Sequence, residues 1–273
     1  MRIKSMGHGV FAATLVIIGT VGLLQGGLSL MWEDLRHGTP HPVALGYLCG
    51  LVSLACGAGL LRRRTAAVAA RTLLALFLLW FLTLKLRYIV AAPAVEGSYQ
   101  SSGESAVMVA AAWVLYAWLA GDWERRQLGF ATGERGVRIA RVIYALALIA
   151  FGLSHFAYLQ LTAPLVPSWL PWHVGWAYFT GSAYLAAGLA ILIAVHGRLA
   201  AALSALQMGF FTLLVWVPVI AAGGVSRVDW CEFYLSWALA AAGWVVADSY
   251  RGEPWLAVRP RSPPVARGEP IGH

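Results

Sequence analysis

The chain has 273 residues, of which 60% are hydrophobic and 12% are charged, and its mean hydropathy is +0.70. A soluble globular domain has roughly 45–50% apolar and about 25% charged residues, so this composition excludes a soluble enzyme and indicates an integral membrane protein. The net charge of +8 would be compatible with nucleic-acid binding. Because the sequence contains no solvated basic domain with base-stacking aromatic residues, we expect no nucleic-acid partner.

Eight apolar stretches follow one another along the chain, centred near residues 20, 52, 80, 113, 149, 184, 210 and 240. Each is long enough for a membrane helix, which requires about 20 mostly apolar residues. The sequence therefore predicts an all-α integral membrane protein with eight transmembrane helices and no soluble catalytic domain. The first stretch also resembles a secretory signal, but no small-residue cleavage site clearly follows it, so we interpret it as the first span.

Lysine and arginine residues cluster in alternate connections between these stretches. They occur at residues 2–4, 62–71, 125–141, 198 and 251–267, whereas the other connections hold only Arg36 and Arg227. This distribution follows the positive-inside rule for an even number of spans. It predicts a multi-pass protein of the inner (plasma) membrane with both termini cytoplasmic and with its basic segments against the lipid headgroups of the bilayer.

The two halves of the sequence are similar to each other, which indicates an internal repeat. At an offset of 131 residues, Tyr47, Gly50 and Gly57 match Tyr178, Gly181 and Gly188, and at 128 Glu104 matches Glu232. At an offset of 130, Gly22 matches Gly152, which places Gln25 opposite His155. We predict two tandem four-helix bundles: a first unit at 1–124, a basic cytoplasmic linker at 125–138, a second unit at 139–250 and a disordered cytoplasmic tail at 251–273.

The second unit contains FGLSHF, then LVPSWLP, then WAYFTGSAYLAAGLAIL. These motifs, in this order, resemble the DoxX-like family of four-helix membrane proteins over roughly residues 139–222, and the first unit resembles it weakly through GLLQG and YLCGLVSLACGAGLL. The resemblance implies a membrane component of a redox complex, because the family is named after a subunit of a thiosulfate:quinone oxidoreductase. Where that family commonly has an acidic residue, this chain has Tyr184, and the repeat partner of Tyr184 is Ser53.

His155 is the first candidate for a ligand contact, because an imidazole in a membrane span must find a hydrogen-bond partner. One interpretation is a contact to a ligand such as a quinone, or a proton relay; the other is a structural lock between its helix and the following loop. That loop holds Trp169 and Trp172, which suit either an interfacial aromatic belt or a lid over a lipophilic pocket. The further ligand-binding candidates are Gln160, His173, Tyr178 and Tyr184.

Four charged residues near the outer ends of spans are candidates of a different kind: Lys85, Arg87, Glu104 and Glu232. Lys85 either extends to the outer surface or pairs with Glu104. Glu104 and Glu232 open their helices, where a carboxylate complements the positive helix N-terminus. His37, His41 and His173 share one membrane face but lack the spacing of a preorganised site, so we expect no metal.

No complete catalytic set is present in the sequence, and we favour a non-catalytic membrane component that binds a lipophilic molecule or a redox or assembly partner on the cytoplasmic side. The alternative is a membrane subunit of a quinone-linked oxidoreductase, with quinone as cofactor. A small-solute transporter is the weaker alternative, because few charges lie within the spans.

Overall fold

The computed structural model describes residues 4–25 and 42–258, and this part of the chain consists of helices joined by turns and short irregular segments, without a strand. The helices are α1 (Met6–Leu24), α2 (Pro42–Leu60), α3 (Ala66–Trp80), α4 (Leu86–Ala91), α5 (Glu96–Leu119), α6 (Asp122–Gln127), α7 (Gly133–Ala157), α8 (Leu159–Thr162), α9 (His173–Leu192), α10 (Gly197–Phe211), α11 (Val217–Ala222) and α12 (Arg227–Asp248). Two π-helical turns, η2 (Phe81–Lys85) and η4 (Thr212–Trp216), join α3 to α4 and α10 to α11, and η3 (Ala163–Leu165) is a short 3₁₀ turn.

Eight of these helical segments are long and apolar enough to cross a membrane, which confirms the predicted fold class. They are Met6–Leu24, Val43–Leu60, Ala66–Ala91, Glu96–Leu119, Gly133–Ala157, His173–Leu192, Gly197–Ala222 and Arg227–Asp248. The chain is therefore a multi-pass membrane protein embedded in a lipid bilayer.

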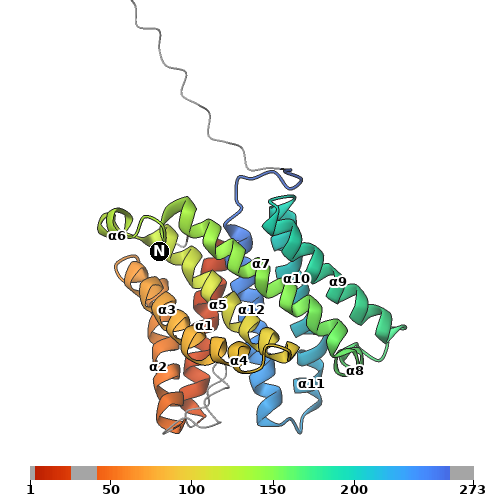
Figure 1. Ribbon diagram of the computed structural model, residues 1–273. Helices are drawn as coiled ribbons and strands as arrows, with labels where there is room; N and C mark the ends of the chain where they lie inside the picture. The colour runs from red at the N-terminus through yellow and green to blue at the C-terminus, as the bar shows by residue number, and fades with distance from the viewer. Residues whose placement is uncertain (1–3, 26–41, 259–273) are drawn as a thin grey trace, which may run out of the picture.

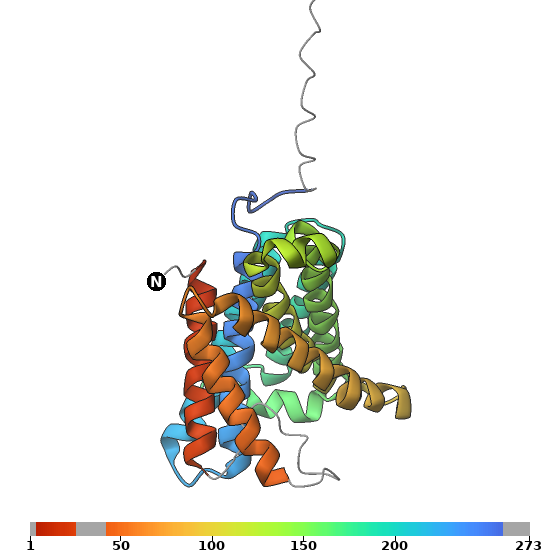
Figure 2. The ribbon, with the colours of Figure 1, turned by 90° about the vertical axis from the view of Figure 1, so that its left-hand side faces the viewer.

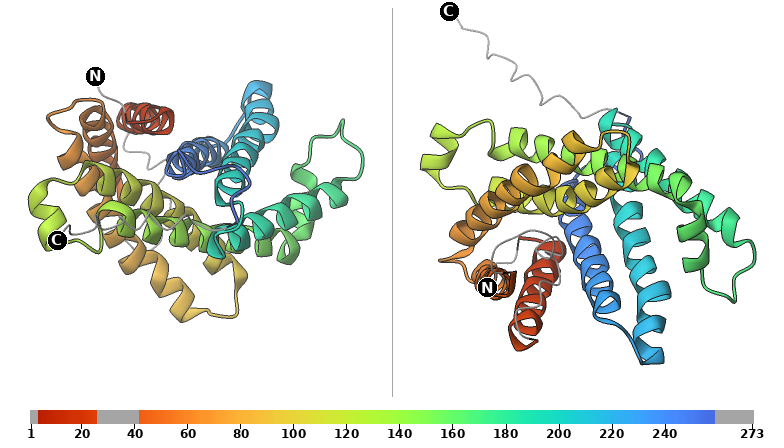
Figure 3. Two further views of the ribbon diagram at one scale, coloured as in Figure 1. Left: turned by 90° about the horizontal axis from the view of Figure 1, so that it is seen from above. Right: turned by 60° about the horizontal axis from the view of Figure 1, so that its bottom comes forward.

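The spans pack in a closed circuit. Going round it, α1 contacts α2, then follow α3, α5, α7, α9, α10 and α12, and α12 returns to α1. In addition α5 contacts α12 across the middle (Figure 1). Seen from above, α12 lies between α1 and the α10–α11 span (Figure 3). The first four spans and the last four are thus joined along α5–α7, α1–α12 and α5–α12.

The two central helices are rich in alanine, glycine and serine. In α5 the buried residues include Gly103, Ala106 and Ala110, and in α12 they include Ala238, Ala242 and Gly243. Small residues let helix backbones approach closely, which is how helices associate in lipid, where no hydrophobic driving force acts between them. The composition of α5 and α12 therefore explains their position at the centre.

Glycine pairs set the crossings of α1 with α2 and of α7 with α9. A Cβ atom added at Gly19 would lie 2.6 Å from Gly50 O, and one added at Gly152 would lie 2.8 Å from Gly181 O.

These contacts correct the repeat offset, because Gly19 and Gly152 are 133 positions apart, not the 130 that we predicted for this pair of helices. The position that corresponds to His155 is therefore Gly22 rather than Gln25. The error arose because three glycines, Gly19, Gly22 and Gly26, offer competing alignments.

The π-helical turns also recur, because η2 and η4 are 131 positions apart. Each contains a threonine whose hydroxyl donates to the carbonyl four residues earlier: Thr83 to Leu79 O at 2.6 Å and Thr212 to Met208 O at 3.0 Å. Such bonds to the backbone compete with the regular helical pattern and bend helices. In the second turn, Pro218 follows closely and lacks the N–H that an unbroken helix would need.

Residues 4–5, α6 and the segment that follows α12 all lie at the same end of the molecule (Figures 1 and 2). The turns at 61–65 and 193–196 belong to this end too, and we call it the arginine-rich end. The segments 92–95, 158–172 and 223–226 lie at the opposite end. Of the linker that we predicted at 125–138, residues 133–138 form the first turns of α7.

The segment after α12 is held against the arginine-rich end. Arg141 donates to Ser249 Oγ and to Glu253 Oε1, both at 2.9 Å, and lies 3.5 Å from the Tyr250 ring centre. Burial raises the pKa of Tyr250 to about 12, so its ring stays neutral beneath the guanidinium at neutral pH. Arg198 likewise donates to Glu253 O at 2.7 Å, and His196 N donates to Ala257 O at 2.7 Å. The first residues of the tail that we predicted at 251–273 are therefore tied to the bundle by these contacts although most are exposed, and residues 259–273 lie outside the described part.

Close packing at Gly19 can be tested with a matched glycine. A Cβ at Gly19 would lie 2.4 Å from Leu54 N, whereas one at Gly209 would meet nothing within 4 Å. We expect Gly19→Ala to lower the free energy of unfolding by about 1–3 kcal/mol, because backbone atoms would have to move. Gly209→Ala should leave it unchanged or raise it by about 0.5–1 kcal/mol. Thermal unfolding in detergent, followed by tryptophan fluorescence, measures both, and equal midpoints for the two variants would contradict the packing.

Candidate functional site

His155 lies in the last turn of α7, at the end of the molecule opposite the arginine-rich end, and its ring packs between α7 and α9. Its Nδ1 is 2.7 Å from Phe151 O, and its ring centre is 5.7 Å from that of Tyr184. The missing side chain of Gly181 makes this placement possible, because a Cβ there would lie 2.7 Å from His155 Cβ. The glycine of α9 therefore creates the space that the imidazole fills.

The bond to Phe151 fixes the tautomer of His155. A carbonyl oxygen only accepts hydrogen bonds, so Nδ1 must carry the proton and a neutral ring must present Nε2 as an acceptor. Within the described residues, Nε2 receives no hydrogen bond. The half-buried ring thus offers one unused acceptor beside the Tyr184 ring.

A second group of polar side chains joins the last turn of α7 to the first turns of α5. Ser154 Oγ donates to Gln100 Oε1 at 2.9 Å, and Gly97 N donates to Tyr158 OH at 3.0 Å. Both carboxyl oxygens of Glu96 are buried here and receive no hydrogen bond from the described residues. The Ser154 hydroxyl is also close to this carboxyl, but its one proton is directed to Gln100, so the Glu96 carboxyl keeps acceptor positions that no described residue fills.

We call these residues the opposite-end cluster: Glu96, Gly97, Gln100, Ser154, His155, Tyr158 and Tyr184. Sequence reasoning found His155 and Tyr184 but missed the contribution of α5. The signal was present in EGSYQSSGES at residues 96–105, a polar run at the start of an otherwise apolar span. A polar run that begins a membrane helix needs partners from a neighbouring helix, and α7 supplies them.

The other predicted ligand-binding residues do not gather around His155. Tyr178 packs against Phe156, with ring centres 5.7 Å apart, and is 45% exposed. Gln160 is exposed, and Trp169 and Trp172 are 69% and 85% exposed. The tryptophans therefore point away from the protein, as an interfacial belt requires, and do not cover His155 as a lid would.

His173, at the start of α9, is half-buried, and its Nε2 makes no hydrogen bond within the described part of the chain. His37 and His41 lie outside the described residues. Among residues 4–25 and 42–258, no three His, Cys, Asp or Glu side chains are placed to hold a metal ion.

Lys85 is buried at the end of η2, and its Nζ donates to Ser101 Oγ of α5 at 2.6 Å. Its side chain therefore faces the protein interior and does not extend to the outer surface. Arg87 is exposed, with its guanidinium 5.3 Å from the ring centre of Tyr88. In the equivalent position to Lys85, η4 carries Trp216.

Glu104 and Glu232 do not open their helices. Because α5 begins at Glu96 and α12 at Arg227, both residues lie beyond the first turn, where the effect of the helix dipole has faded. The acids in the first turns are Glu96 and Asp229. Asp229 forms a capping box with Ser226, since each side chain pairs with the other's backbone N–H.

Comparison with protein-family models, with curated proteins and with solved structures found no match to this chain. Membership of the DoxX-like family therefore stays a prediction from the motifs.

The contact between α5 and α7 can be tested at Tyr158. Tyr158→Phe removes the acceptor of Gly97 N and should lower the free energy of unfolding by about 1–3 kcal/mol. Tyr178→Phe is the matched control: its exposed ring keeps the contact with Phe156, so we expect a change within about 0.5 kcal/mol. Thermal unfolding in one detergent compares them, and a Tyr158→Phe midpoint equal to that of the parent chain would argue against this hydrogen bond.

Proposed function

We propose that this membrane protein is a non-catalytic component that binds a lipophilic molecule at the opposite-end cluster. The observation that carries the proposal is an excess of hydrogen-bond acceptors there. Both Glu96 carboxyl oxygens are buried, and the Ser154 hydroxyl close to them donates to Gln100, while His155 Nε2 on the neighbouring helix receives no hydrogen bond from the described residues. Buried polar groups are normally paired, so unpaired acceptors at one end of a membrane bundle favour a ligand with donors.

The surroundings of the cluster favour entry from the bilayer. Leu153, Tyr178 and Phe179 are 48%, 45% and 63% exposed and lie on α7 and α9, the two helices that hold His155 and Tyr184. Within the described residues, the cluster offers acceptors and aromatic rings but no nucleophile hydrogen-bonded to a base. Binding therefore fits the cluster better than turnover does.

Retention of a small molecule by the purified full-length protein tests this proposal. Extracts of protein prepared in mild detergent should contain one lipophilic species that mass spectrometry quantifies in proportion to the protein. His155→Phe keeps an aromatic ring but loses the acceptor, and we expect about tenfold less retention, which corresponds to one hydrogen bond. Gln160→Ala, an exposed change nearby, should retain the parent amount. Equal retention by the His155→Phe and parent proteins would overturn the proposal.

The quinone-linked alternative predicts which redox form of the ligand binds. A hydroquinone hydroxyl can donate to His155 Nε2, whereas a quinone carbonyl cannot pair with an acceptor. If a quinone is the ligand, its reduced form should bind better to the neutral-histidine protein. A partner protein at the arginine-rich end remains a prediction from the sequence.

We infer that the arginine-rich end faces the cytoplasm of the plasma membrane. This end carries Arg62–Arg64, Arg125, Arg126 and Arg251, while Arg87 and Arg227 lie at the opposite end. The positive-inside rule then places both termini in the cytoplasm.

Reporter fusions check this orientation. Green fluorescent protein, which fluoresces only when folded inside, should fluoresce at the C-terminus, and alkaline phosphatase, active only outside, should be active when inserted after the exposed Pro93. The reverse pattern at these two sites would show the opposite orientation.

A further inference from the structure

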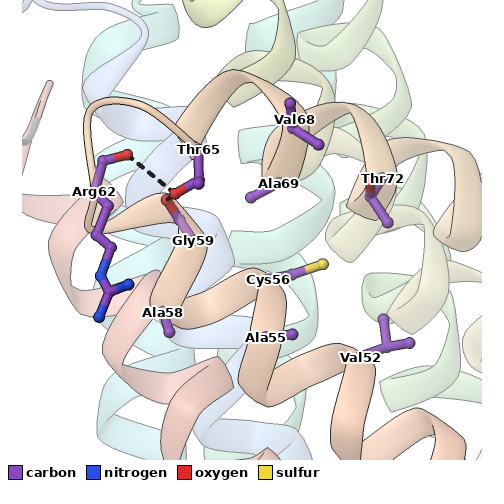
Figure 4. Close-up of a pocket in the computed structure, with 10 residues that line it drawn as sticks. All are labelled: Val52, Ala55, Cys56, Ala58, Gly59, Arg62, Thr65, Val68, Ala69 and Thr72. Atoms are coloured by element: carbon purple, nitrogen blue, oxygen red, sulfur yellow. Dashed lines mark hydrogen bonds between the residues drawn. The ribbon is translucent and has the colours of Figure 1, made fainter.

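A groove of about 440 Å³ lies between α2 and α3 near the arginine-rich end, away from the opposite-end cluster. Figure 4 shows Val52, Ala55 and Cys56 along the wall from α2, and Val68, Ala69 and Thr72 along the wall from α3. Its volume falls within the range of roughly 300–1,000 Å³ typical of ligand sites.

The geometry of the turn between the two helices creates this groove. A Cβ at Gly59 would lie 2.9 Å from Ala69 Cβ, so the helices nearly touch there. Thr65 Oγ1 donates to Gly59 O at 2.8 Å and fixes the start of α3 above the end of α2 (Figure 4). Small side chains on both walls below this point leave a channel that nothing in the described chain fills.

The groove faces lipid. Ala55 is exposed, and Leu51 and Val68 are 56% and 51% exposed, on helices that belong to two adjacent membrane spans. In a membrane protein such a surface meets acyl chains rather than water. An apolar channel of this kind accepts a hydrocarbon chain.

The mouth of the groove is strongly positive. Arg62, Arg63 and Arg64 are exposed in the turn that closes it, and neither α2 nor residues 61–72 contain an acidic residue. Arg62 lines the groove, and its long side chain runs from the turn along α2 (Figure 4). An exposed guanidinium can reorient toward a phosphate, with which it forms charge-assisted hydrogen bonds. Arg71, by contrast, is paired with Glu124 at 3.0 Å.

We propose that this groove is a binding site for an anionic phospholipid. One acyl chain lies along the small residues of α2 and α3, and the headgroup phosphate is held by the arginines of the turn. The apolar walls and the positive mouth together match the two parts of such a lipid, and a neutral lipid or a soluble anion matches only one of them. The proposal depends on the membrane fold but not on a ligand at the opposite-end cluster.

Native mass spectrometry of the full-length protein with added lipid tests the site. With equal phosphatidylglycerol and phosphatidylcholine in the detergent, we expect one phosphatidylglycerol to be retained preferentially. Arg62→Gln should reduce this retention about fivefold. Arg135→Gln, an exposed arginine at the same end on α7, is the matched control and should have no effect.

A second variant separates the groove from general attraction to positive charge. Ala55→Leu places a larger apolar side chain at an exposed position in the channel, so it should preserve folding but reduce phosphatidylglycerol retention severalfold. If Ala55→Leu binds as much as the parent, or if both lipids are retained equally, the groove is not a specific site. Displacement by millimolar inorganic phosphate would indicate a soluble-anion site and would likewise overturn the proposal.

Discussion

Close approach of helix backbones at small residues is the interaction on which the rest of the molecule depends. Where Gly19 meets Gly50 and Gly152 meets Gly181, a single added Cβ would fall within 3 Å of a backbone carbonyl oxygen of the partner helix. In lipid, dispersion contacts of this kind must replace the hydrophobic effect. The same requirement places the alanine-rich α5 and α12 at the centre. Between α2 and α3 the close approach is at Gly59, and the groove lies where the two helices separate beyond it.

In such a tightly packed bundle, buried polar groups are normally hydrogen-bonded, so an unpaired one calls for an explanation. Two buried groups elsewhere in the bundle are satisfied: Tyr144 OH and Ser204 Oγ lie 3.0 Å apart, and His8 Nε2, near the arginine-rich end, lies 3.0 Å from Leu60 O. At the opposite-end cluster the acceptors of Glu96 and His155 have no donors in the described chain. The other buried unpaired atoms among the described residues are single ring nitrogens, on His173, His196 and Trp216. This cluster differs from them because α5 and α7 each contribute an acceptor to it, which makes it the place to look for a ligand.

The sequence was sufficient for the spans because hydrophobic length alone defines a membrane helix. It was insufficient wherever the outcome depended on where a helix begins or on what its neighbour contributes. Because the sequence analysis placed the start of α5 at Glu104 rather than Glu96, it missed about two polar turns of this helix. His155 could be singled out as a histidine in a span, but its bond to Phe151 and its contact with Tyr184 depend on the tilt of α7 against α9. Those contacts follow from three-dimensional packing at Gly181, which no linear pattern specifies.

The two halves show how one backbone arrangement carries different chemistry. Gly22 and Ser53 occupy the positions that correspond to His155 and Tyr184, and in both halves the two residues belong to helices that cross at a glycine pair. In the first half both residues are small and buried, so α1 and α2 pack against each other with little between them. In the second half both are large, polar and aromatic, and their rings touch. Since the glycine contacts that support the backbone are shared, the change from Gly and Ser to His and Tyr is not needed for the fold. His155 and Tyr184 thus differ together from their counterparts, although the helix crossing that holds them is the same in both halves. A ligand that contacts His155 and Tyr184 explains this difference better than helix packing alone.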